Sequence, residues 1–185
     1  MGGDNAPGIV IKGANIARRR FPDVHFLIFG DQQKIQSLMR KLPALSSACT
    51  IVHTDKVITN EAKPSLAVRQ GKGSSMQLAV DSVRQGNAAG VVSAGNTGAL
   101  MAMAKLGLRM LPGIDRPAIA GVFPTLRNEL VMLDLGANVD CDADNLIQFA
   151  VMGGIFSRAV LGVLNPSVGL LNVGTEQVKG NSAVR

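Results

Sequence analysis

Four glycine-rich segments contain the side chains that could do chemistry. They are residues 1–7 (MGGDNAP), 93–98 (SAGNTG), 134–140 (DLGANVD) and 172–181 (NVGTEQVKGN). Glycine lets the backbone approach a ligand closely, and a helix that follows such a segment offers free N–H groups to an anion. The last segment adds one cation, Lys179, among amide donors. A single turn of this kind is usually ordinary turn chemistry, but four of them with Asn and Thr side chains predict an anion site.

Short apolar runs that alternate with helical patterns must position these segments. Strands are expected at residues 24–29, 50–53, 89–93, 119–123, 130–135 and 168–173, and helices at residues 32–41, 74–85, 143–161 and directly after Gly98. Near-continuous apolar strands between helices are typical of a mostly parallel sheet covered on both faces. Ligands bind beyond the carboxyl ends of such strands, which would place the four segments at one edge. Because no linker or repeat interrupts the pattern, residues 1–185 are expected to form a single α/β unit.

A metal site is the weaker interpretation of the acidic residues in the second half. Asp134, Asp140, Asp142 and Asp144 could suggest a hard metal ion, but their spacing is not that of an EF-hand loop. Asp142 or Asp144 is better placed to cap the helix that follows. We therefore expect no metal.

Covalent and nucleotide chemistry are also weakly supported. Cys141, near a helix start, is a candidate nucleophile, but the two histidines, His25 and His53, fall in predicted strands where a structural role is expected. Residues 71–75 (GKGSS) resemble only the end of a P-loop, and the dinucleotide pattern G-x-G-x-x-G does not follow a predicted strand. We therefore expect no cofactor.

Charge is uneven along the chain. The 19 Lys+Arg and 13 Asp+Glu residues give a formal charge of +6, and residues 1–92 hold 12 basic and 6 acidic residues. A basic half favours an anionic partner, although residues 18–20 (RRR) fit the dipole of a helix end. The lack of Trp and Tyr argues against binding single-stranded nucleic acid. Two cysteines without disulfide spacing, no secretory leader and no bilayer-length apolar stretch predict a cytoplasmic protein.

Eight segments, in order along the chain, resemble the bacterial phosphate acyltransferase family, PlsX. Besides the four above they are residues 63–65 (KPS), 73–76 (GSSM), 112–117 (PGIDRP) and 148–153 (QFAVMG). The resemblance implies a Rossmann-like three-layer α/β/α sandwich related to isopropylmalate dehydrogenases and phosphotransacetylases. It also implies an acyltransferase that converts acyl-[acyl carrier protein] and orthophosphate to acyl phosphate and free carrier protein, which feeds the first acylation of glycerol 3-phosphate in bacterial phospholipid synthesis.

The resemblance also implies partners and a place in the cell. Family members form homodimers, and their product connects them to a membrane glycerol-3-phosphate acyltransferase, at the inner face of the cell membrane. The acidic carrier protein would be the partner of the basic half. Family members have one strand before the Met1 segment and roughly as much chain again after residue 181. The sequence is therefore expected to be a truncated domain that lacks the first strand and the C-terminal part.

The implied reaction assigns roles to the candidate residues. Because phosphate itself can attack a thioester, the protein must supply an anion cradle and donors for the oxyanion, not a nucleophile. The cradle would be residues 95–98, with Asn96 and Thr97 as side-chain donors. Lys179 would neutralise phosphate or the oxyanion, with Asn138 and Asn181 as amide donors.

The two acidic candidates are Asp4 and Asp134, which would orient these donors or accept a proton from phosphate. The predicted catalytic set is thus Lys179, Asn96, Asn181 and Asp4. The predicted phosphate-binding set is Gly2, Gly3, Ser93, Gly95, Thr97, Gly98, Asp134, Gly136, Asn138 and Gly174.

Two other functions stay open at this point. One is a phosphotransacetylase-like acyltransferase that uses coenzyme A. The other is a non-catalytic or inactive module that only binds an acidic carrier protein. A dehydrogenase is the least supported, because the dinucleotide fingerprint is missing.

Overall fold

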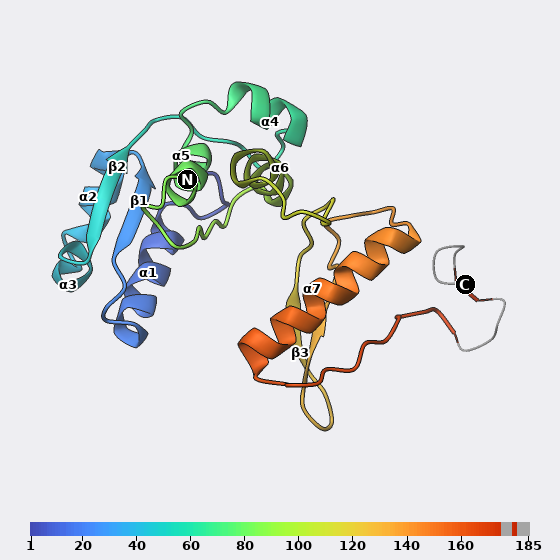
Figure 1. Ribbon diagram of the computed structural model, residues 1–185. Helices are drawn as coiled ribbons and strands as arrows, with labels where there is room; N and C mark the ends of the chain where they lie inside the picture. Colours follow the sequence, from blue (N-terminus) through green and yellow to red (C-terminus); the bar gives the residue numbers. More distant parts are fainter. Residues whose placement is uncertain (175–178, 181–185) are drawn as a thin grey trace. The chain divides into compact units, whose positions relative to one another are not determined.

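The computed structural model describes residues 1–174 and 179–180 (Figure 1). Its helices and strands are α1 (Gly8–Arg20), β1 (Phe26–Gly30), α2 (Gln32–Met39), α3 (Pro43–Ser46), β2 (Cys49–His53), α4 (Pro64–Gln70), α5 (Ser75–Arg84), α6 (Thr97–Leu108), β3 (Gly121–Pro124), β4 (Glu129–Met132) and α7 (Ala143–Leu161). The chain divides into two compact units, unit 1 (Met1–Arg109) and unit 2 (Met110–Arg185). That residues 1–185 act as one α/β unit stays a prediction. None of the helices in the described ranges is long and apolar enough to cross a membrane.

Unit 1 is built on a parallel pair of strands, which confirms the α/β fold class. β1 and β2 pair from Phe26 opposite Cys49 to Gly30 opposite His53. Helices α1, α2 and α3 pack against each other and close one core on this pair. The buried members of that core are Ile11, Ile28, Ile35, Met39 and Leu45. Burying each large aliphatic side chain contributes about 1.5–3 kcal/mol, so this core holds the two strands in place.

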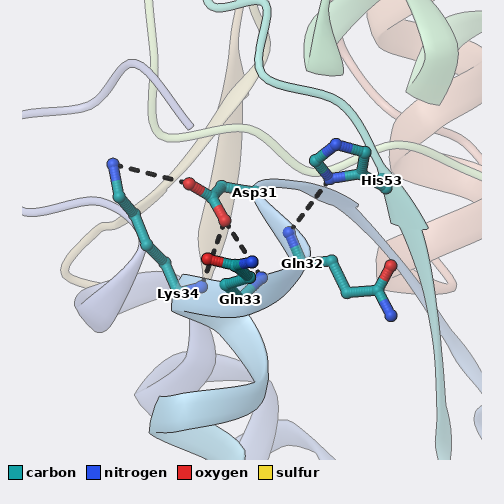
Figure 2. A network of polar contacts seen from close by, with 5 residues as sticks. All are labelled: Asp31, Gln32, Gln33, Lys34 and His53. Atoms are coloured by element: carbon teal, nitrogen blue, oxygen red, sulfur yellow. Dashed lines mark hydrogen bonds and ion pairs between the residues drawn. The ribbon is translucent and has the colours of Figure 1, made fainter.

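Helix α2 begins at the carboxyl end of β1 because Asp31 caps it. The Asp31 carboxylate accepts hydrogen bonds from the backbone N–H groups of Gln33 (3.0 Å) and Lys34 (3.1 Å), and the Lys34 ammonium lies 3.6 Å away (Figure 2). At the end of β2, the ring nitrogen Nδ1 of His53 accepts from the backbone N–H of Gln32 at 3.2 Å. The network joins the ends of both strands and gives His53 a structural contact.

These contacts make the stability of unit 1 depend on pH. The backbone N–H of Lys34 is the main cause that holds the pKa of Asp31 below its ordinary value of 3.8, followed by the Lys34 charge and the N–H of Gln33. A carboxyl group with a lowered folded-state pKa stabilises the fold above its unfolded pKa, and this contribution is lost as the pH falls through the folded pKa. We expect Asp31→Asn to lower Tm at neutral pH and to lose that effect below pH 3.8. The measurement is thermal unfolding of the wild type and of Asp31→Asn at a series of pH values. A Tm difference that stays constant as the pH falls below 3.8 would contradict the prediction.

A second core in unit 1 fixes the direction of α6. Its buried members come from α4, α5, α6 and the loop before α4: Ile58, Ala67, Met76, Val80, Ala99 and Met103. Ser74 caps α5 by accepting from the backbone N–H of Gln77 at 3.3 Å. The structure confirms the predicted helices at residues 74–85 and after Gly98. Because α6 packs against both α4 and α5, the position of its N-terminus is set by this core.

Two predicted strands are wrong. Residues 89–93 and 168–173 have no strand conformation, and Val92 and Leu171 are 99% and 83% exposed. Both segments have the composition of a buried strand, but a strand also needs a neighbour for its N–H and C=O groups. Within the described ranges neither segment is paired with one. The composition of these two segments indicates β propensity, but a strand forms only when a neighbouring strand pairs with it.

Unit 2 contains an antiparallel hairpin, which a mostly parallel fold allows. β3 and β4 pair with Gly121 opposite Met132, so the strands predicted at residues 119–123 and 130–135 exist with shifted ends. A parallel connection needs about a dozen residues or more. Residues 125–128 join the two strands directly, which allows only the antiparallel arrangement.

Helix α7 has the bounds predicted from the sequence, Ala143–Leu161. The Asp142 carboxylate accepts from the backbone N–H of Asn145 at 2.8 Å, and the Asn145 side-chain oxygen accepts from the backbone N–H of Asp142 at 3.4 Å. This reciprocal pair is a capping box. Gly162, with φ of 71°, ends the helix in the left-handed conformation that glycine tolerates.

The capping box predicts a measurable loss of stability. Asp142→Ala removes an acceptor from the first turn of α7 and should cost about 1 kcal/mol of folding free energy. Asp144→Ala is the matched control, because Asp144 lies in the same turn but is not the N-cap. Asp144→Ala should lower the folding free energy by no more than a few tenths of a kcal/mol, because it removes the favourable interaction of the carboxylate with the dipole of α7. Equal decreases of Tm in the two variants would show that the charge, and not the cap, is what matters.

Candidate functional site

Three loops of unit 1 meet at the N-terminus of α6. They are residues 1–6, 57–62 and 93–98. A Cβ atom at Gly3 would lie 2.5 Å from the carbonyl oxygen of Ala94, and one at Gly2 would overlap the carbonyl oxygen of Ile58. Gly2 also has φ of +104°, which other residues rarely adopt. The first loop therefore passes so close to the other two that only glycine fits.

The 93–98 loop has its own close contacts. The Ser93 hydroxyl oxygen accepts from the backbone N–H of Gly95 at 3.2 Å. A Cβ atom at Gly98 would lie 2.9 Å from Pro64, and one at Gly95 would be 3.8 Å from the backbone of Gly2. The structure thus brings Gly95, with Ser93 bonded to it, beside the first loop, while Gly98 packs against Pro64 at the start of α4.

Asn96 uses its whole side chain within the protein. Its amide oxygen accepts from the backbone N–H of Ala99 at 2.9 Å and caps α6. Its amide nitrogen lies within 3.2 Å of three carbonyl oxygens, those of Thr59, Asn60 and Ala62. An amide has only two N–H groups to share among them. In this arrangement Asn96 positions the neighbouring loop. Because Asn96 also takes the N–H of Ala99, the donors left at the helix start are the exposed Thr97 and the backbone N–H groups of Thr97 and Gly98.

Asp4 is held by a residue that the sequence did not single out. The side-chain amide of Asn60 donates to the Asp4 carboxylate at 2.7 Å, and the Asn60 backbone carbonyl accepts from Asn96 at 3.0 Å. Asn60 therefore connects Asp4 with the cap of α6. No motif or spacing marks residue 60, because each bond joins segments more than thirty residues apart.

In unit 2, Asp134 organises the loop that follows β4. One carboxylate oxygen accepts from the backbone N–H of Ile119 at 2.7 Å, and the other accepts from the backbone N–H of Asn138 at 2.6 Å and from its side-chain amide at 3.2 Å. That amide also donates to the carbonyl of Pro117 at 2.9 Å. Gly136 lies between them with φ of +91°. The structure brings Asp134, Gly136 and Asn138 together as one rigid turn.

Further contacts fasten this turn to its surroundings. Arg116 donates from Nη1 to the carbonyl of Asp140 at 3.0 Å. The Gln148 side chain, on α7, accepts from the backbone N–H of Asp115 at 2.8 Å and donates to its carboxylate at 2.7 Å. These residues lie in segments that carried the family resemblance, but none was proposed as a site residue. The two bonds of Gln148 hold Asp115 against α7.

The remaining predicted residues lie near the end of the described chain. Lys179 is exposed, and its backbone carbonyl accepts from the side-chain amide of Asn172 at 3.2 Å. Gly174 belongs to the same segment, residues 172–181. Asn181 lies outside the described residues.

The thiols and acidic residues offer little other chemistry. Burial raises the pKa of the Cys49 thiol, which makes it a weaker nucleophile at neutral pH. The Cys141 sulfur lies 4.0 Å from the carbonyl of Asn138. In the part of the chain that the structure describes, no three His, Cys, Asp or Glu residues form a group that could hold a metal ion. Each unit therefore offers hydrogen-bond donors and fixed carboxylates.

Comparisons with known proteins agree on one family. The family model of the fatty acid synthesis protein matches residues 1–185. Proteins named phosphate acyltransferase are 62% identical in Rhodospirillum centenum, 59% in Paramagnetospirillum magneticum and 58% in Rhodospirillum rubrum, each over 100% of this chain. The chain covers 52%, 53% and 53% of these relatives, about half their length. This chain therefore belongs to the fatty acid synthesis protein family, whose curated relatives carry the name that its eight segments suggested.

Proposed function

We propose that the protein is a phosphate acyltransferase that makes acyl phosphate from acyl-[acyl carrier protein] and orthophosphate. The observation that carries the proposal is the meeting of residues 1–6, 57–62 and 93–98 at the N-terminus of α6. Two glycine contacts and the Asn96 cap fix these loops. Because Asn96 accepts from the N–H of Ala99, the donors left at the start of α6 are the backbone N–H groups of Thr97 and Gly98. Such a helix start favours an anion by charge and by hydrogen bonding. The name of the relatives, phosphate acyltransferase, supports the coarser part of the proposal, the transfer of an acyl group to phosphate.

The reaction needs positioned donors and no residue that forms a covalent bond. A phosphate oxygen adds to the acyl carbonyl carbon, and the carbonyl oxygen becomes an oxyanion. When the carbonyl reforms, the carbon–sulfur bond breaks and the carrier leaves as a thiolate, which takes up the proton that phosphate has given up. Thr97 and the first-turn N–H groups would bind phosphate, and Lys179 would neutralise it or the oxyanion. Asn138 and Asn181 would be amide donors to the reacting groups. Donors aimed at a developing oxyanion are commonly the largest single contribution to such catalysis.

Two carboxylates have different roles in the proposal. Asp134 has both oxygens occupied by its own chain, so it would orient Asn138. Asp4 has one oxygen bound to Asn60, so it is the candidate acceptor for a proton of phosphate. Gly2, Gly3 and Gly95 would let the backbone approach the anion.

The carrier protein would bind through charge. The residues before position 93 hold 12 basic and 6 acidic side chains, and oppositely charged surfaces raise association rates and specificity. As part of the same proposal the protein acts as a homodimer in the cytoplasm, at the inner face of the membrane. It would pass acyl phosphate to a membrane glycerol-3-phosphate acyltransferase.

The test supplies the protein, expressed from its complete gene, with acyl-[acyl carrier protein] and orthophosphate, and traps acyl phosphate with hydroxylamine. Acyl hydroxamate that depends on phosphate is the expected result. A parallel reaction with acyl-coenzyme A distinguishes a phosphotransacetylase-like enzyme, which would prefer that donor. Carrier binding that disappears at high salt, without any hydroxamate, would replace the proposal by a non-catalytic binding module.

A further inference from the structure

Asp4 and Asn60 form a hydrogen-bonded pair whose geometry suits a more specific role than the binding of any anion. Both residues are exposed, yet the Asn60 amide holds one oxygen of the Asp4 carboxylate at 2.7 Å. Asn60 is itself held by its backbone, which accepts from Asn96 at 3.0 Å, and Asn96 caps α6. Two hydrogen bonds therefore connect the Asp4 carboxylate to the start of α6.

A carboxylate at an anion site needs an explanation, because it repels a ligand of the same charge. An ionised carboxylate only accepts hydrogen bonds. It can contact an anion favourably when that anion still carries a proton to donate. At neutral pH orthophosphate keeps at least one proton, whereas sulfate has none.

We infer that Asn60 positions the Asp4 carboxylate to accept the proton of orthophosphate, which makes this pair the feature that selects phosphate over sulfate. The inference rests on the proposed function and deepens it by naming the ionic form of the substrate. Sulfate matches phosphate in size and shape, but it would leave Asp4 without a donor and add repulsion. Charge repulsion that only the protonated ligand can offset is one way in which a site rejects an isosteric competitor.

The test measures selection directly. Equilibrium binding of orthophosphate and of sulfate by calorimetry, together with sulfate inhibition of acyl phosphate formation, gives the ratio of the two affinities. Asp4→Asn replaces the acceptor by a group that can donate to sulfate, and we expect it to lower the phosphate preference by at least about ten-fold, the worth of one hydrogen bond to a charged group. Asn60→Ala leaves Asp4 charged but unheld, so a smaller loss is expected, mainly in the KM for phosphate.

Two further variants separate positioning from a merely structural role. Asn60→Gln keeps the amide and should recover part of the preference, whereas Asn60→Ala should not. The backbone contact to Asn96 survives both changes, because it involves only the Asn60 carbonyl. Asn87→Ala is the matched control: Asn87 is also exposed, and its side-chain amide donates to Gln85 at 3.2 Å. It should leave the preference unchanged.

The outcomes distinguish this inference from the proposed function. An unchanged phosphate-to-sulfate ratio in Asp4→Asn, or a loss in Asn60→Ala equal to that in Asn87→Ala, overturns the inference while acyl phosphate formation stands. Wild-type protein that selects phosphate but forms no acyl phosphate overturns the proposed function and supports the inference. Wild-type protein that binds neither ion overturns both.

Discussion

Replacing Lys179 by alanine is expected to lower kcat/KM for acyl phosphate formation by about 10²–10³-fold, the usual effect of losing one donor to an oxyanion. Lys179 is the one cation in residues 172–181. Its side chain is exposed, while its backbone is held by Asn172. An exposed ammonium group on a backbone that Asn172 contacts suits electrostatic stabilisation of phosphate or of the oxyanion. Hydroxylamine trapping across a range of phosphate concentrations measures the loss.

The controls assign that loss to charge at this position. Lys41→Ala removes another exposed lysine, just after α2, and should change the rate by less than a few-fold. Lys179→Arg keeps the charge but replaces a compact ammonium by a planar guanidinium, so partial activity is expected. If the loss appears only in the KM for the carrier and shrinks at high salt, Lys179 serves docking and not the chemical step. A kcat/KM within a few-fold of wild type in Lys179→Ala would remove it from the mechanism.

Elements with local signals were predictable with their bounds. The Asp142 cap and the apolar period that follows it lie within a few residues of each other, and α7 has the predicted range. The start of α2 at Gln32, directly after Asp31, was also predicted, whereas its end at Met39 falls two residues before the predicted residue 41. Caps and helical periodicity involve contacts three or four residues apart, so a sequence carries them without knowledge of the tertiary structure.

Strand pairing was predictable only where a neighbour was present. Residues 26–30 and 49–53 pair as expected of a parallel fold. Residues 89–93 and 168–173 have similar composition but no paired strand within the described ranges. Because the hydrogen bonds of a strand belong to its neighbour, composition cannot decide whether a strand forms.

The candidate site, too, could be predicted from the sequence only in part. Glycine-rich turns with Asn and Thr are visible in the sequence, and the structure brings those of unit 1 together at α6. Asn60 was not visible, because its bond to Asp4 joins residues 56 positions apart. From the sequence, Asp134 was a candidate either to accept a proton from phosphate or to orient the donors. Its contacts with Ile119 and Asn138 favour the second role.

Alanine at Gly3 is expected to disrupt the site by forcing two loops apart. The added Cβ would lie 2.5 Å from the carbonyl oxygen of Ala94 and 3.1 Å from its carbonyl carbon. Both are backbone atoms, so no side-chain rotation relieves the overlap. A displacement of about 1 Å in a positioned site can cost about 10²-fold in rate, and overpacking costs about 1–3 kcal/mol in folding stability. Acyl phosphate formation, phosphate calorimetry and thermal unfolding should all show the loss.

Gly13→Ala is the matched control, because it adds the same methyl group to unit 1 with no atom within 4 Å of it. Gly13 lies inside α1, where alanine is favoured over glycine by about 0.8–1 kcal/mol. This variant should therefore raise Tm and leave phosphate binding unchanged, while Gly3→Ala lowers both. The difference between the two variants isolates the contact between the first loop and the 93–98 loop. If Gly3→Ala bound phosphate and turned over like wild type, these two loops would not act together on the anion, and the proposed cradle would lose its first loop.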